Sequence, residues 1–273
     1  MFDFEKALAN AKQDLTSNKL FLILLGASGN GKSYALGTLG VKTLYLYAEG
    51  EDHGPASAFQ KGQANILPFC FNRSDEGALL SADDALKRLH AILDDVETLT
   101  KYKIKAIAID GASEIEDILR ETKFFKASTT KAFSEGPVEH GMFKVIVSKL
   151  KNLQRVIGIH VVLTCILNVK ELGDDGTILD STPALHGYQV ATGLVQQFAD
   201  VMLIGRMQKG GKVGYRLQLL AAASKSTGNF DTKEVRKTLN FSPRLTGVDI
   251  LTLPPLLEPD LSKLIELKAK GAV

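Results

Sequence analysis

The sequence predicts an α/β protein with a mostly parallel central sheet that is flanked by helices and carries a C-terminal antiparallel hairpin. Three observations predict this fold. Short, wholly apolar runs recur along the chain, as expected of strands that are buried on both faces of a parallel sheet. Stretches with helical spacing of apolar residues separate these runs, which is typical of parallel crossover connections. Two late runs, 199–204 and 215–220, are joined by a turn containing Gly210 and Gly211, which indicates a hairpin.

The apolar runs give the expected strands in chain order: 20–25, 43–48, 66–71, 104–110 and 159–166. Helices are expected where apolar residues recur three to four positions apart: 1–18, from the glycine-rich turn to about 39, from 82 to 96, from 138 to 157, and from 261. The third of these begins with a capping box, in which Ser81 precedes Asp84 by three residues. The stretch 111–137 is polar and ambiguous, and 172–188 is expected to be a long loop.

The expected organisation is an N-terminal helix over 1–18, one core over 19–240 and an irregular tail over 241–273. The apolar share is 45%, enough for a proper core, and the net charge of +2 does not by itself indicate a partner. Cys70 and Cys165 both lie in apolar runs, which predicts buried, reduced thiols and not a disulfide or a metal site.

Nothing in the sequence indicates a membrane. No apolar run approaches the ~18–20 residues that a membrane-spanning helix needs. The first residues also lack the basic-then-apolar pattern of a signal peptide. A cytoplasmic protein without membrane partners is therefore expected.

A phosphate-binding loop follows the first expected strand. Gly26-Ala27-Ser28-Gly29-Asn30-Gly31-Lys32-Ser33 matches G-x-x-x-x-G-K-[ST] at every required position. The glycines let backbone N–H groups turn inward around a phosphate, Lys32 should reach the β- and γ-phosphates, and the Ser33 hydroxyl should bind Mg²⁺. The motif therefore predicts ATP and Mg²⁺ as cofactors, the alternative being a chance glycine-rich turn.

An acidic residue is expected near the metal, and Asp110 supplies it at the end of an apolar strand. The alternative is a strand that merely ends in an aspartate cap. Hydrolysis also needs a base, but the residue directly after Asp110 is Gly111. Glu49, at the end of the strand after the phosphate-loop helix, is the predicted base, with Glu51 as a near competitor and Glu114 as a weaker one. A solvated loop acid is the plain alternative for Glu49.

A basic segment lies further along the chain. Residues 120–155 carry eight Lys and Arg residues against three Glu residues. Cations bind the phosphates of a single strand and rings stack on its bases. We therefore expect DNA contacts from the interleaved basic and aromatic side chains Lys123, Phe124, Lys126, Lys131 and Phe133. The alternative is a helix whose rings belong to the core and whose lysines are solvated.

With these motifs in place, the chain resembles the RecA family of recombinases and its phage relatives from about Leu20 to Phe230. The shared order is the phosphate loop, a strand ending in Ala48-Glu49, a strand ending in Ile109-Asp110, and a strand reaching Asn168. The large terminal domains of bacterial RecA are absent. The compact core looks most like the phage-encoded RecA-like ATPases of recombination and single-strand annealing.

The resemblance implies a RecA-like P-loop NTPase core and further site residues. Glu49 would be the catalytic glutamate, and Asn168 (or Thr164) the γ-phosphate sensor. Lys225 would act in trans on the ATP of a neighbouring subunit, with Arg206 as a weaker candidate. An active site completed in this way implies self-association into a ring or filament. A phage-encoded protein of this kind would work in the host cytoplasm.

These expectations lead to one main function and two alternatives. The main hypothesis is a DNA-stimulated ATPase that acts on single-stranded DNA in recombination, annealing or repair, with a single-strand-binding protein as a further partner. The first alternative is a RecA-fold motor or regulatory ATPase that acts on protein. The second is a nucleotide-dependent assembly protein without DNA binding, in which Glu49 is not catalytic.

Overall fold

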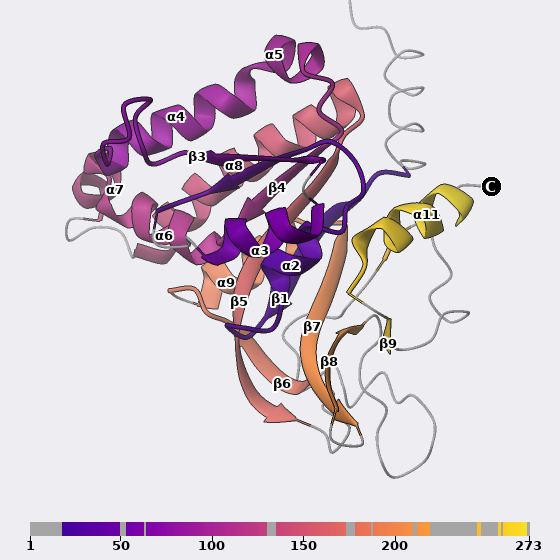
Figure 1. The fold of residues 1–273 in the computed structure, drawn as a ribbon. Helices are drawn as coiled ribbons and strands as arrows, with labels where there is room; N and C mark the ends of the chain where they lie inside the picture. The colour runs from indigo at the N-terminus through magenta and orange to yellow at the C-terminus, as the bar shows by residue number, and fades with distance from the viewer. Residues whose placement is uncertain are drawn as a thin grey trace, which may run out of the picture.

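The computed structural model is α/β. The residues that it describes are 18–49, 53–62, 64–129, 135–172, 178–186, 188–209, 212–218, 245–246, 256–257 and 259–271. Within these residues a nine-stranded sheet has the order β3-β2-β4-β5-β1-β7-β8-β9, and β6 pairs with the far end of β5 (Figure 1). The predicted N-terminal helix over 1–18 lies almost wholly outside the described residues, as does about half of the predicted tail.

Six strands form the parallel part of the sheet: β1 (Phe21–Gly26), β2 (Thr43–Tyr47), β3 (Ile66–Cys70), β4 (Ala106–Asp110), β5 (His160–Leu172) and β7 (Asp200–Lys209). β8 (Lys212–Gln218) pairs antiparallel with β7, and the short β9 (Leu256–Leu257) pairs with β8. The mostly parallel sheet and the late hairpin are therefore confirmed. All the parallel strands end at the same edge, so the loops that follow them meet there.

Two layers of helices cover the sheet (Figure 1). One layer contains α4 (Ala82–Asp94), α5 (Val96–Lys101), α6 (Ala112–Glu121), α8 (Glu135–Ile157) and α9 (Tyr188–Gln196). The other contains α2 (Lys32–Leu36), α3 (His53–Gly62) and α11 (Leu261–Gly271). Side chains alternate along β1, so Ile23 and Leu25 pack under the first layer whereas Leu22 and Leu24 pack under the second.

The structure corrects three expectations. The predicted loop over 172–188 is wrong in part, because β6 (Ile178–Pro183) returns antiparallel along β5 and α9 begins at Tyr188. The helix after the phosphate loop ends at Leu36, three residues earlier than expected, because the chain then tightens into turns in which Thr38 and Leu39 donate to carbonyls three residues back. The ambiguous stretch after Gly111 contains two helices, α6 and α7 (Lys123–Ser128). No helix in the described part of the chain is long and apolar enough to cross a bilayer.

Candidate functional site

The phosphate loop joins the end of β1 to the start of α2. Gly29 and Gly31 take positive φ values of 74° and 80°, which residues with a side chain rarely adopt, so the loop turns where the motif has glycine. The Lys32 ammonium donates hydrogen bonds to the carbonyls of Gly26 (2.9 Å) and Ala27 (3.0 Å). Lys32 thus lies folded across its own loop, beside the backbone that the motif predicts to hold phosphate.

Ser33 and Asp110, the predicted metal residues, lie beside the same point on α3. A Cβ atom placed on Gly54 would come within 2.7 Å of Asp110 Oδ2 and 3.1 Å of Ser33 Oγ. Only a residue without a side chain leaves this space open. A hydroxyl and a carboxylate are the oxygen donors that Mg²⁺ accepts, together with phosphate oxygens and water. The residues therefore fit the predicted ion. Among the described residues there is no cluster of three or more His, Cys, Asp or Glu residues of the kind that holds other metals.

The Asp110 carboxylate is held on both sides although it is only 4% exposed. Its Oδ1 accepts a hydrogen bond from Thr164 Oγ1 (2.6 Å), and its Oδ2 accepts one from the Tyr45 hydroxyl. Thr164 in turn accepts from the Gly111 N–H (2.9 Å), which ties the end of β4 to β5. Tyr45 was not anticipated, because a tyrosine in a strand of apolar residues looks like an ordinary core residue.

Glu49 lies two residues beyond Tyr47, which pairs with Asp110 across the sheet. Its backbone N–H donates to Asn72 Oδ1 (2.7 Å), and its carboxylate forms an ion pair with Arg73. Asn72 and Arg73 follow β3, so the loop after β3 fixes both the backbone and the side chain of the predicted base. Arg73 was not anticipated from the sequence.

The two competing glutamates differ in placement. Glu51 lies outside the described residues. The Glu114 carboxylate lies against Gly111 at the start of α6, in the space that a side chain on Gly111 would take. A carboxylate there adjoins the residue after Asp110, so both Glu49 and Glu114 lie at the strand edge that carries the site.

The predicted sensor and trans-acting residues are only partly described. Asn168 is exposed on β5, two residues beyond Ile166, which pairs with Gly26 of the phosphate loop. Thr164, the other sensor candidate, is fully buried and engaged by Asp110 and Gly111. Lys225 lies outside the described residues, and of Arg206 only its backbone pairing in β7 is described.

The predicted DNA-contacting segment forms α7, which packs against α6 and α8. Phe124 is 62% exposed, whereas Phe125 is buried with its ring 5.3 Å from the Arg120 guanidinium. Lys126 forms an ion pair with Glu121, and the backbone N–H of Lys123 faces Asp83. Lys131 and Phe133 lie outside the described residues. Among the described residues of this segment, Phe124 is therefore the exposed ring, and Glu121 neutralises the positive charge of Lys126.

A buried carboxyl pair links α6 and α8 to the turn before α9. Glu116 of α6 accepts a hydrogen bond from the His186 N–H (2.7 Å), and Glu139 of α8 accepts one from Arg120 (3.3 Å). Burial, followed by the neighbouring Glu139 carboxyl, raises the pKa of Glu116 to about 8. Glu116 therefore carries a proton near neutral pH.

The two cysteines are free, as expected, but only Cys165 is buried, whereas Cys70, at the end of a half-exposed strand, is partly exposed. Cys70 lies beside Asn72, to whose Oδ1 its thiol donates at 3.1 Å. Burial raises the pKa of the Cys165 thiol to about 12, which leaves it protonated and unreactive. Neither thiol contributes to the site. No protein-family model matches the chain, and no curated protein matches it either.

Proposed function

We propose that this protein binds and hydrolyses ATP with Mg²⁺ as a RecA-like P-loop ATPase that acts on single-stranded DNA. The observation that supports this most strongly is the meeting of Ser33 and Asp110 beside Gly54, next to a loop that Lys32 already spans. An oxygen-donor pair and a phosphate loop at one strand edge suit a Mg-nucleotide better than any other common ligand.

Each residue of the site would have a separate role. The backbone N–H groups of the loop would bind the phosphates, and Lys32 would exchange its bonds to Gly26 and Ala27 for bonds to phosphate oxygens. Ser33 and Asp110 would hold Mg²⁺, which neutralises charge on the phosphates. Tyr45 and Thr164 fix the Asp110 carboxylate in position.

Proton transfer belongs to a glutamate at the strand edge. Glu49 would take a proton from the attacking water, and it must turn from Arg73 to do so. Asn168 is the exposed polar side chain just past the phosphate loop, where it would sense the γ-phosphate. Lys225 would reach the site from a neighbouring subunit of a ring or filament.

The DNA part of the proposal rests on the basic character of residues 120–155, on the exposed Phe124 and on the family resemblance. ATP binding at a subunit interface would favour the DNA-bound assembly, and hydrolysis would release it. Recombination, annealing or repair would each use such a cycle, with a single-strand-binding protein as a partner.

The test is steady-state ATP hydrolysis with and without single-stranded DNA, at low and moderate salt, for the wild type and K32A. We expect hydrolysis that DNA stimulates, stimulation that fades with salt, and no turnover in K32A. Equal turnover in K32A would refute the ATPase. Hydrolysis that depends on Lys32 but ignores DNA would keep the ATPase and move its action to a protein substrate.

A further inference from the structure

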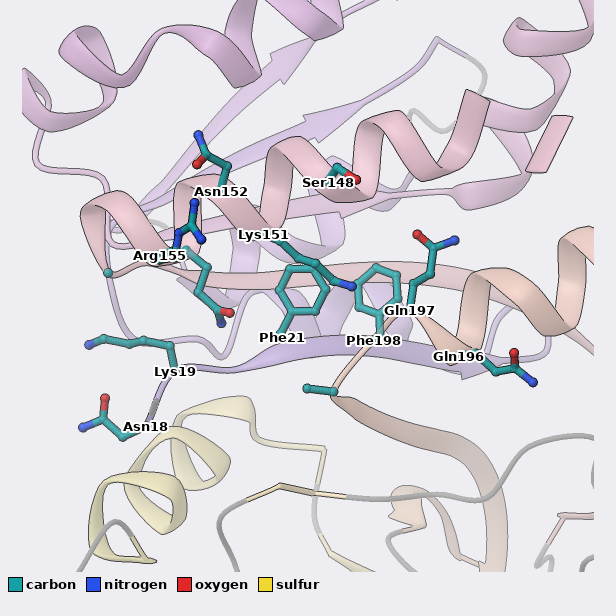
Figure 2. A pocket seen from close by; sticks show the side chains of 13 residues that line it. Asn18, Lys19, Phe21, Ser148, Lys151, Asn152, Arg155, Gln196, Gln197 and Phe198 are labelled. Atoms are coloured by element: carbon teal, nitrogen blue, oxygen red, sulfur yellow. The ribbon is translucent and has the colours of Figure 1, made fainter. Parts of the chain in front are cut away.

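A hollow of about 760 Å³ lies at the opposite end of the sheet from the phosphate loop. It borders the residues at the start of β1, the last turns of α8 and the turn between α9 and β7 (Figure 2). β1 separates the two places, because the hollow reaches Phe21 and the phosphate loop begins at Gly26, about 16 Å further along the strand. The volume is in the range of ligand-binding pockets.

The lining is positively charged. Among the described residues that line the hollow, Lys19, Lys151 and Arg155 are the charged ones, and none is Asp or Glu. The Lys151 ammonium lies 5.8 Å from the centre of the Phe21 ring, which stacks on Phe198 with a 4.8 Å separation of centroids. Figure 2 shows Lys151 stretched across these rings, which form the floor. Burial and then the neighbouring Lys144 lower the pKa of Lys151, as expected of a cation near another cation.

The Lys and Arg residues of 120–155 fall into two groups, those that form ion pairs and those that do not. Arg120, Lys126 and Lys149 form ion pairs with carboxylates on their own surface. Lys151 and Arg155 form no ion pair with any residue that the structure describes. Of the four described cations in this segment that form no ion pair, three lie in or beside the hollow, and the fourth, Lys123, lies on α7.

The polar side chains around the hollow are of two kinds. Gln154 donates to the Leu20 carbonyl (2.9 Å) and Gln197 to the Gly193 carbonyl (3.3 Å), so these amides hold the walls. Ser148 and Asn152 are exposed beside Lys151, at helical spacing with Arg155. They offer neutral hydrogen-bonding groups next to the cations.

Further along α8, beyond the hollow, another lysine follows on the same side. A neighbouring hollow of about 500 Å³ shares Ser148 and Asn152 with the first and includes Lys144. From Lys144 to Arg155 the helix rises about 16 Å, which a chain of phosphates can follow and a single phosphate cannot cover. The second hollow also contains Asp94, which forms an ion pair with Lys149. The first hollow has no acid among the described residues, and together with this length that favours an extended polyanion.

We propose that the hollow and the adjoining face of α8 bind the phosphates of single-stranded DNA, through Lys19, Lys144, Lys151 and Arg155. This inference rests on the proposed action on single-stranded DNA and gives it a site on α8 instead of α7. The site lies away from the phosphate loop, so a bound strand leaves the nucleotide site open.

The experiment measures fluorescence anisotropy of a labelled oligothymidine across a series of salt concentrations. We compare the wild type with K151E/R155E, and with K123E/K126E on α7 as a control that makes the same charge change. For K151E/R155E we expect binding weaker by about tenfold or more and a shallower salt dependence, by about one unit of slope for each lost contact. The control should keep nearly wild-type affinity. K151Q/R155Q should show a smaller loss in the same direction, and all variants should keep the wild-type melting temperature.

Other outcomes overturn the inference in distinguishable ways. Wild-type affinity in K151E/R155E, with loss in K123E/K126E, would return the strand to α7 and leave the proposed function intact. If the wild type binds no oligothymidine, the DNA part of the proposed function fails together with this site. If K151E/R155E weakens binding of tripolyphosphate but not of oligothymidine, the hollow belongs to a small phosphate compound.

Discussion

The Arg73 guanidinium forms an ion pair with the carboxylate of Glu49, the proposed base. Arg73 also donates to the Gly77 carbonyl (3.1 Å), so the loop after β3 holds it in place. The two side chains are 42% and 32% exposed, and a pair this accessible stabilises a protein by only about 0–1 kcal/mol. The main effect of the ion pair is therefore to hold the Glu49 carboxylate in one orientation, towards Arg73.

The first prediction follows from this orientation. We expect E49Q to bind ATP normally but to lose turnover by roughly 10²–10⁴-fold, because an amide cannot accept the proton from water. R73A removes the ion pair that Glu49 must leave before it can act, so we expect kcat not to fall and KM and the melting temperature to stay nearly unchanged. Single-turnover hydrolysis and nucleotide-binding titrations measure both. Normal turnover in E49Q would move the base to Glu114 or Glu51.

The second prediction concerns the space that Gly54 leaves beside Ser33 and Asp110. A methyl group in G54A would lie 2.7 Å from Asp110 Oδ2, so we expect loss of Mg²⁺-dependent ATP binding and of hydrolysis. G141A is the matched control, since Gly141 is also helical and a Cβ atom there meets nothing within 4 Å. Binding measured by calorimetry with and without Mg²⁺ would test this. A G54A protein that binds Mg-ATP like the wild type would argue against the metal position.

Motif spacing and apolar runs were sufficient to predict the parallel sheet and the glycine-rich turn between β1 and α2. Both depend on local sequence: a buried strand must be apolar, and a turn around phosphate requires glycine at particular positions. The Ser81 hydroxyl accepts the Asp84 N–H (3.2 Å), as the capping box predicts, because that contact is also local.

The features that the sequence did not reveal depend on contacts between distant segments. β6 has no apolar pattern of its own and forms because β5 extends past the sheet and offers it a partner. Arg73 meets Glu49 only because β2 and β3 are adjacent. The pairing of Lys126 with Glu121 likewise could not be read from the net charge of the segment.

The third prediction is a pH dependence of stability from Glu116. Its pKa rises from an ordinary value of 4.5 to about 8 in the folded protein, so the folded state holds a proton that the unfolded state has released. The resulting stabilisation is complete below pH 4.5 and is lost as the pH rises towards and through 8. We therefore expect the free energy of unfolding of the wild type to fall over this range, by up to a few kcal/mol.

E116Q supplies the comparison for that prediction. A glutamine stays neutral, can still accept from the His186 N–H, and can donate to Glu139 Oε1, which has no hydrogen-bond partner otherwise. In urea denaturation, E116Q should be nearly as stable as the wild type at pH 5 and more stable at pH 8.5. Parallel pH profiles for the two proteins would show that Glu116 does not hold the proton.

The last prediction concerns the buried ion pair that attaches α11 to the sheet. Lys268 donates to both carboxylate oxygens of Asp200 (3.0 and 2.7 Å), and the two side chains are 2% and 0% exposed. Asp200 also accepts the N–H groups of Phe21 and Thr246, both at 2.9 Å, so its charge stays in the core when the lysine is removed.

We expect K268A to lower the free energy of unfolding by about 3–5 kcal/mol, the usual cost of an unpaired buried charge. K270A is the control, since Lys270 is exposed on the same helix and its removal should change stability little. Because Phe21 begins the strand that carries the phosphate loop, K268A should also weaken ATP binding at temperatures near its melting point. Equal stability of K268A and K270A would mean that α11 does not anchor to Asp200 in solution.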